Sequence, residues 1–149
     1  VDLDASCLLF DTSGNLVDTV WFRQLESHCG SIRHSGDDRS GGGEAGADNE
    51  RIAIDLSRVP VTVQALLFTV NSFSGESFAG IPNAFCRLVD DANGGEIARF
   101  DLSLEGGSHT GLIMTKLYRH NNEWKMQALG ESAEGRTFHD LLPALRPYL

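Results

Sequence analysis

The sequence predicts an all-β protein, an antiparallel β-sandwich that ends in a short C-terminal helix. Eight short segments are rich in apolar and β-branched residues, and clusters of Gly, Asn, Asp and Ser separate most of them. Only the last fifteen residues show a helical pattern. Many short strands joined by turns are typical of antiparallel sandwiches rather than of helical or α/β folds.

The first half of the chain supplies four of the expected strands. In "RIAIDL" the alternation places Ile52, Ile54 and Leu56 on one face, whereas "VQALLFTV" is apolar enough to be buried on both faces. The turn signal "DTSGN" joins the first two strands. We expect these four strands at residues 5–10, 16–22, 51–56 and 63–70.

The second half supplies two hairpins and the helix. "DANGG" is a hairpin signal because Asn93 and Gly94 accept positive φ at little cost, and "RHNN" marks the second hairpin. In "GRTFHDLLPALRPYL", Thr137 is expected to cap a helix that Pro143 interrupts after one or two turns. The four strands are expected at residues 83–90, 96–102, 109–118 and 123–130.

The composition is that of one globular domain over residues 1–149. A net charge of −9 and a pI near 4.8 argue against nucleic acid as a partner. No apolar run approaches the 18 residues of a transmembrane segment, and no signal peptide opens the chain.

The cysteines and histidines carry no recognisable catalytic or zinc motif. Three widely spaced cysteines without C-x-x-C favour a reducing compartment. Cys7 and Cys86 lie in apolar strands, as buried packing residues do, so Cys29 is the one candidate for a reactive thiol. The five histidines lack zinc-type spacing, and no P-loop, dinucleotide fingerprint or nucleophile elbow is present.

The stretch "GDDRSGGGEAGADNE", residues 36–50, combines five carboxylates with five glycines. Calcium takes six to eight oxygen ligands from carboxylates and backbone carbonyls, and glycines let a long loop turn its carbonyls inward. The acids at 2 and 4 of "DLDAS" share one face of a strand and could close such a cage, although the EF-hand spacing is not met. A solvated acidic loop is the alternative that composition alone leaves open.

Several long strings follow one another over nearly the whole chain: "DLDAS", "SIRHSGDDRSG", "RIAIDLSRVP", "NAFCRLVDDANGGEIARFDL" and "KLYRHNNEWKMQALGE". In sequence and in order they resemble the TerD family of tellurium-resistance and stress-response proteins. "VWFRQLES" and the ending "GRTFHDLLPAL" are most similar to the TerZ branch. The resemblance implies a calcium-binding β-sandwich, bacterial and cytoplasmic, that holds one or two Ca²⁺ ions.

The resemblance also implies a set of metal-binding residues. Many relatives carry an acid where this chain has Gly42, so the number of ions stays open. The family domain also begins earlier, so its first strand is expected to be absent here. Carried over by position, the metal-binding residues are Asp2, Asp4, Asp37, Asp38, Arg39, Gly41, Glu44, Asp48, Asn49 and Glu50.

The function expected from this resemblance is non-enzymatic. Calcium would order the acidic loop and so support interaction with other proteins of the stress and tellurite-resistance system. Peripheral association with a membrane through those partners is compatible with this function. One alternative is cation-dependent binding of a nucleotide or phosphoester, or an enzyme-like role. Another is a structural subunit that calcium only stabilises. The sequence leaves the partners and the oligomeric state open.

Overall fold

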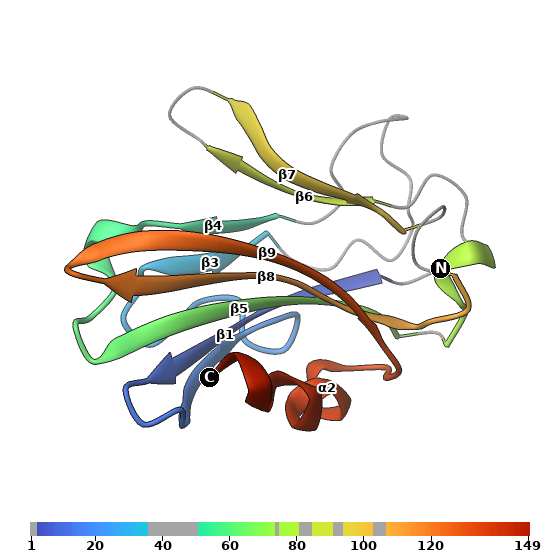
Figure 1. The fold of residues 1–149 in the computed structure, drawn as a ribbon, viewed down its shortest axis with the longest axis horizontal. Helices are drawn as coiled ribbons and strands as arrows, with labels where there is room; N and C mark the ends of the chain where they lie inside the picture. Colours follow the sequence, from blue (N-terminus) through green and yellow to red (C-terminus); the bar gives the residue numbers. More distant parts are fainter. Residues whose placement is uncertain (1–2, 36–50, 74, 81–84, 91–93, 103–106) are drawn as a thin grey trace.

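The computed structural model describes residues 3–35, 51–73, 75–80, 85–90, 94–102 and 107–149 (Figure 1). Its centre is a five-stranded sheet in which every neighbouring pair is antiparallel. The strands, in spatial order, are β2 (Leu16–Val20), β1 (Leu3–Asp11), β5 (Val63–Ser72), β8 (Gly111–His120) and β9 (Glu123–Ala133).

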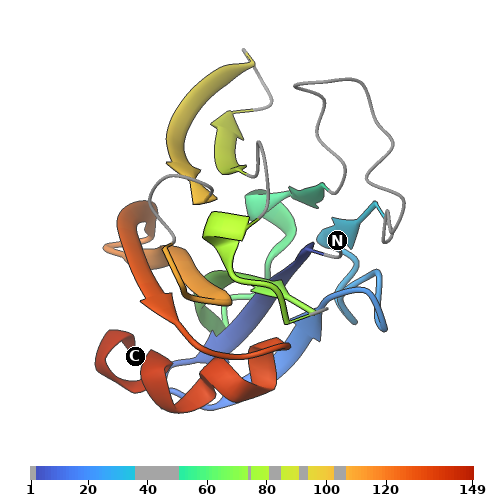
Figure 2. The same cartoon turned by 90° about the vertical axis from the view of Figure 1, so that its right-hand side faces the viewer.

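Two small antiparallel sheets cover one face of the central sheet, and the C-terminal helix covers the other (Figures 1 and 2). The first small sheet pairs β3 (Ile32–His34) with β4 (Ile52–Ile54), and the second pairs β6 (Phe85–Asp90) with β7 (Gly95–Asp101). The helix is α2 (Phe138–Leu145). Three short 3₁₀ helices complete the described elements: η1 (Leu56–Arg58), η2 (Phe78–Gly80) and η3 (Arg146–Tyr148).

The three inner strands of the central sheet, β1, β5 and β8, are largely buried on both faces, which explains their nearly continuous apolar sequences. Leu66, Phe68 and Val70 of β5 belong to the hydrophobic cluster that Ile32, Ile52, Ile54 and Phe100 join from the small sheets. Leu67 of β5 belongs to the second cluster, which lies under α2. Alternate residues of a strand point to opposite faces, so β5 contributes to both clusters in turn.

The predicted fold class is confirmed, and both hairpins are present. Asn121 and Asn122 have positive φ in the β8–β9 turn, as "RHNN" predicts, and Gly94 has φ +71° after β6. Strand β3 was not expected. It has only three residues and no alternation long enough to detect, and its partner β4 lies across the acidic stretch.

Helix α2 begins directly after Thr137, as expected, but the Thr137 side chain makes no capping hydrogen bond. Pro143 lies inside the helix, which continues to Leu145. The Asp140 carboxylate accepts a hydrogen bond from the Arg136 amide at 3.0 Å, which ties down the chain just before the first turn. Pro143 and His139 are both exposed, so the carbonyl that proline leaves unbonded can be hydrated. The missing hydrogen bond is therefore tolerated.

Candidate functional site

Of the ten predicted metal-binding residues, the structure describes Asp4 only. Asp2 and residues 36–50, which carry the other nine, lie outside the described residues. Within the described part of the chain, no three or more His, Cys, Asp or Glu side chains form a cluster that could hold a metal ion. The described parts of the predicted site are therefore Asp4 and the residues that flank the acidic stretch.

The two ends of the acidic stretch are held together by hydrogen bonds. The Ser35 amide donates to the Arg51 carbonyl at 2.8 Å, and the Arg51 amide donates to Ser35 Oγ at 2.8 Å. These bonds extend the β3–β4 pairing, in which His34 is opposite Ile52. The chain thus leaves and re-enters the described fold at one fixed point.

Asp4 lies near the start of β1 and is 3% exposed. Cys7 and Leu9 of the same strand pack in the cluster under the small sheets, whereas Leu8 and Phe10 pack in the cluster under α2. Because strand residues alternate between faces, Asp4 belongs to the α2-facing side. The β3–β4 sheet packs on the opposite face, so a ligand set that includes Asp4 and the acidic stretch must meet around the start of β1.

A second hydrogen-bonded site joins β2 to the connection between β2 and β3 and is centred on Asp18 of β2. Its carboxylate accepts hydrogen bonds from the Thr19 amide at 2.8 Å, the His28 amide at 2.7 Å and Gln24 Nε2 at 2.8 Å. It also pairs with His28 Nδ1 at 2.9 Å. Partial burial raises the pKa of Asp18, but these bonds outweigh burial, so its pKa lies below the ordinary value. The hydrogen bonds of this carboxylate hold the connection between β2 and β3 in one conformation.

That connection holds the Cys29 thiol between two buried serine hydroxyls. Sγ lies 3.2 Å from Ser27 Oγ and 2.9 Å from Ser31 Oγ. Burial raises the pKa of Cys29, but hydrogen bonds from the two hydroxyls and from the Ser31 and Cys29 amides outweigh it and lower the pKa below its ordinary value. The position of Cys29 in a polar stretch predicts a reactive thiol, but it does not reveal the role of the two serines, although "SHCGS" places them symmetrically about the cysteine.

We expect Cys29 to react with iodoacetamide at lower pH than an ordinary thiol, because a lowered pKa means that the thiolate is present at lower pH. Cys7 should stay unmodified in the folded protein, because it is fully buried and burial raises its pKa. The measurement is alkylation rate against pH, read at each cysteine by mass spectrometry.

The variant Ser31→Ala should move the midpoint of the Cys29 profile to higher pH, since it removes the closer hydroxyl donor. A wild-type midpoint at or above the ordinary thiol pKa of about 8.5 would contradict the expectation.

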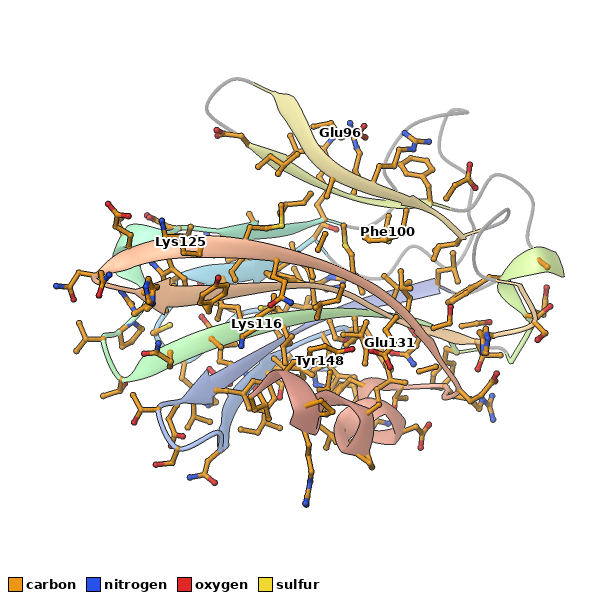
Figure 3. The ribbon with its side chains drawn as sticks, viewed as in Figure 1. Glu96, Phe100, Lys116, Lys125, Glu131 and Tyr148 are labelled. Atoms are coloured by element: carbon orange, nitrogen blue, oxygen red, sulfur yellow. The ribbon has the colours of Figure 1, made fainter. Side chains whose placement is uncertain are left out.

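One hollow of about 110 Å³ lies between the end of β1 and the C-terminal residues. Phe10, Asp11, Lys116, Tyr118 and Leu149 are among the residues that line it. Figure 3 shows Lys116 on the central sheet above the C-terminal segment that carries Tyr148. Pockets for drug-sized ligands usually measure about 300–1,000 Å³, so this hollow offers no room for a nucleotide.

No helix in the described ranges has the length and apolar character needed to cross a membrane.

Comparison with known proteins identifies what the chain resembles. The sequence profile of the TerD domain matches residues 1–143. The chain is 50% identical over 141 residues to tellurium resistance protein TerZ of Serratia marcescens, covering 95% of this chain and 71% of that protein. It is 36% identical over 141 residues to general stress protein 16U of Bacillus subtilis (strain 168), covering 90% of this chain and 72% of that protein.

Solved structures agree on the fold. A Streptomyces coelicolor A3(2) protein, described as a homologue of the telluride resistance protein TerD, superposes with a TM-score of 0.79 at 16% identity. The match covers 89% of this chain and 79% of the other. A second structure, described as a protein of unknown function, superposes with a TM-score of 0.78 at 21% identity and covers 95% of this chain and 85% of the other. At these identities the likeness concerns the fold alone.

Proposed function

This chain belongs to the TerD family of tellurium-resistance and stress-response proteins, and from that premise we propose that it is a calcium-binding, non-enzymatic domain. Calcium orders the acidic stretch 36–50 against the start of β1. The ordered stretch then presents a surface to other proteins of a bacterial, cytoplasmic stress system. Relatives named for tellurium resistance and for general stress support this setting.

The observation that carries the proposal is the burial of Asp4, a residue that is only 3% exposed. A buried carboxylate is costly unless cations or hydrogen-bond donors compensate it, and such groups mark functional sites more often than ordinary packing positions do. Asp4 lies in the "DLDAS" segment, near the end of the sheet at which the chain begins (Figure 1). A calcium ion there would have access both to Asp4 and to acids brought by a loop.

The acidic stretch fits the other half of such a site. Five carboxylates in fifteen residues repel one another, and Arg39 is the only basic residue among them. A divalent cation relieves that repulsion, and the paired Ser35 and Arg51 hold the two ends of the stretch together. Holding the ends reduces the entropy that the loop loses when it closes around an ion.

The substitution Asp37→Asn tests the assignment directly. We expect it to weaken calcium binding by roughly tenfold or more, because a hard cation prefers a charged carboxylate to a neutral amide of the same shape. Calorimetric titration of calcium into both proteins measures the change.

Glu76→Gln is the matched control, since Glu76 is an exposed carboxylate outside both "DLDAS" and the acidic stretch 36–50. It removes the same charge, so it should leave the affinity within about twofold if binding is site-specific. Equal losses in the two variants would mean that calcium only forms an ion atmosphere around an acidic protein.

A further inference from the structure

Strand β5 buries three polar side chains with an oxygen atom that has no hydrogen-bond partner among the described residues: Ser72 on one face, and two on the face that Asp4 shares. The two are Thr69 Oγ1 and Asn71 Oδ1, and both residues are 1% exposed. Their neighbours Phe68 and Val70 pack under the small sheets, so Thr69 and Asn71 lie on the α2-facing side of the sheet, as Asp4 does. Polar atoms buried in this way are rare and call for an explanation.

The strand register places these oxygens next to Asp4. Asn71 is the direct partner of Asp4 across the β1–β5 ladder, and Thr69 is the direct partner of Ser6. Directly opposed residues have Cβ atoms about 4.5–5.5 Å apart. Four oxygen-bearing side chains therefore form a block on two adjacent strands, and each of the four is at most 3% exposed.

The orientation of the Asn71 amide is fixed by its other end. Nδ2 donates to the Gly135 carbonyl at 3.0 Å, and Gly135 is itself held by a hydrogen bond from its amide to Thr110 Oγ1 at 3.0 Å. Flipping the amide would set two acceptors against each other, so Oδ1 must point away from Gly135. An acceptor left unsatisfied in this way costs about 1–3 kcal/mol.

On the β8 side the block is closed. A Cβ added to Gly111 would lie 3.0 Å from Leu141 Cδ2 and 3.3 Å from both the Ala133 carbonyl oxygen and Asn71 Nδ2, so Gly111 of β8 leaves no free space beside the amide nitrogen. Oδ1 lies at the other end of the amide. The other neighbour of β5 is β1, on which Asp4 is the direct partner of Asn71.

We propose that Asn71 Oδ1 is a ligand of the calcium ion that binds at Asp4, and that Thr69 Oγ1 supplies the next oxygen of the same site. The inference rests on the proposed calcium function and adds two oxygen atoms of β5 to Asp4 of β1. Side-chain carbonyl and hydroxyl oxygens are hard donors of the kind that calcium accepts beside carboxylates. One cation would then satisfy two buried oxygens that the described fold leaves unbonded.

Thr69→Val gives the cleanest test, because it removes the hydroxyl and keeps the shape of the side chain. We expect Thr69→Val to lower the calcium affinity by roughly threefold or more, and Asn71→Leu to lower it by roughly tenfold or more. In the presence of a chelator, Thr69→Val should melt at the wild-type temperature or above, because it also removes an unsatisfied buried oxygen. Calorimetric titration gives the affinities, and thermal unfolding gives the stabilities.

Thr115→Val is the matched control. Thr115 is a fully buried threonine of β8 whose hydroxyl donates to the Gln127 carbonyl at 2.9 Å. Its loss should lower the melting temperature with and without calcium and leave the affinity within about twofold of wild type.

Two failures are distinguishable. If the wild-type protein binds calcium and both Thr69→Val and Asn71→Leu bind it with wild-type affinity, the assignment of the β5 ligands is wrong. A buried water molecule would then satisfy these two oxygen atoms instead. If the wild type binds no calcium, the proposed function fails and this inference fails with it.

Discussion

Calcium at a hundredfold excess over its Kd is expected to raise the melting temperature of this protein by roughly 5–10 °C. A ligand that binds only the folded form adds RT ln(1 + [L]/Kd), which is about 2.7 kcal/mol at that excess. Each kcal/mol moves the melting temperature of a domain of about 150 residues by about 2–4 °C. Thermal unfolding in calcium and in chelator measures the difference.

The same two conditions should differ in limited proteolysis. Calcium should protect the glycine-rich segment 41–46, because an ion coordinated by its neighbours restrains a stretch that is otherwise rich in like charges. The thermal effect should persist in moderate salt, since a coordinated ion is screened far less than surface charges are. If calcium changed neither the melting temperature nor cleavage at 41–46, the stretch would be an ordinary solvated loop.

Gly130→Ala is expected to lower the melting temperature by roughly 5–15 °C. Gly130 lies in β9 with φ +60°, and an added Cβ would be 2.9 Å from Phe100 Cζ and closer still to Cε1. Phe100 reaches down from β7 toward the central sheet (Figure 3). A non-glycine residue at positive φ costs about 1–3 kcal/mol, and overpacking costs about 1–3 kcal/mol more. Thermal unfolding of the variant measures the sum.

Gly94→Ala separates the two costs. Gly94 also has positive φ, at +71°, but an added Cβ would have no neighbour within 4 Å among the described atoms. This control should therefore show only the backbone cost, about 1–3 kcal/mol. Equal decreases in melting temperature in the two variants would contradict the close packing of Phe100 on Gly130. Other contacts would then hold the β6–β7 hairpin on the central sheet.

Local signals in the sequence were sufficient for much of the fold. The alternation in "RIAIDL" and the turn residues of the two hairpins report on neighbours in the chain, and both hairpins are present. Strand β3 depends instead on pairing with β4 across a separation that carries no pattern of its own. The helical periodicity was likewise sufficient to place α2, whereas the position of Pro143 depended on which side of the helix faces water.

In the candidate site, too, some residues can be predicted from local sequence and others only from the fold. The acids at 2–4 and 36–50 are visible because charge and glycine gather locally. Thr69 and Asn71 lie in an apolar strand, and their importance comes only from the register that sets Asn71 opposite Asp4. The two serines around Cys29 are near it in sequence, but their hydrogen bonds depend on a loop shape that the Asp18 carboxylate sets.

Calorimetric titration of calcium into the wild-type protein, repeated with magnesium, tests the proposed calcium site most directly. We expect at least one calcium per chain and an affinity for calcium roughly tenfold or more above that for magnesium. Magnesium demands near-ideal octahedral geometry at about 2.1 Å and gives up its waters reluctantly, whereas a long loop with two strands offers a larger and more adaptable oxygen site. Absence of binding at millimolar calcium, or equal affinities for the two ions, would contradict a built calcium site in this protein.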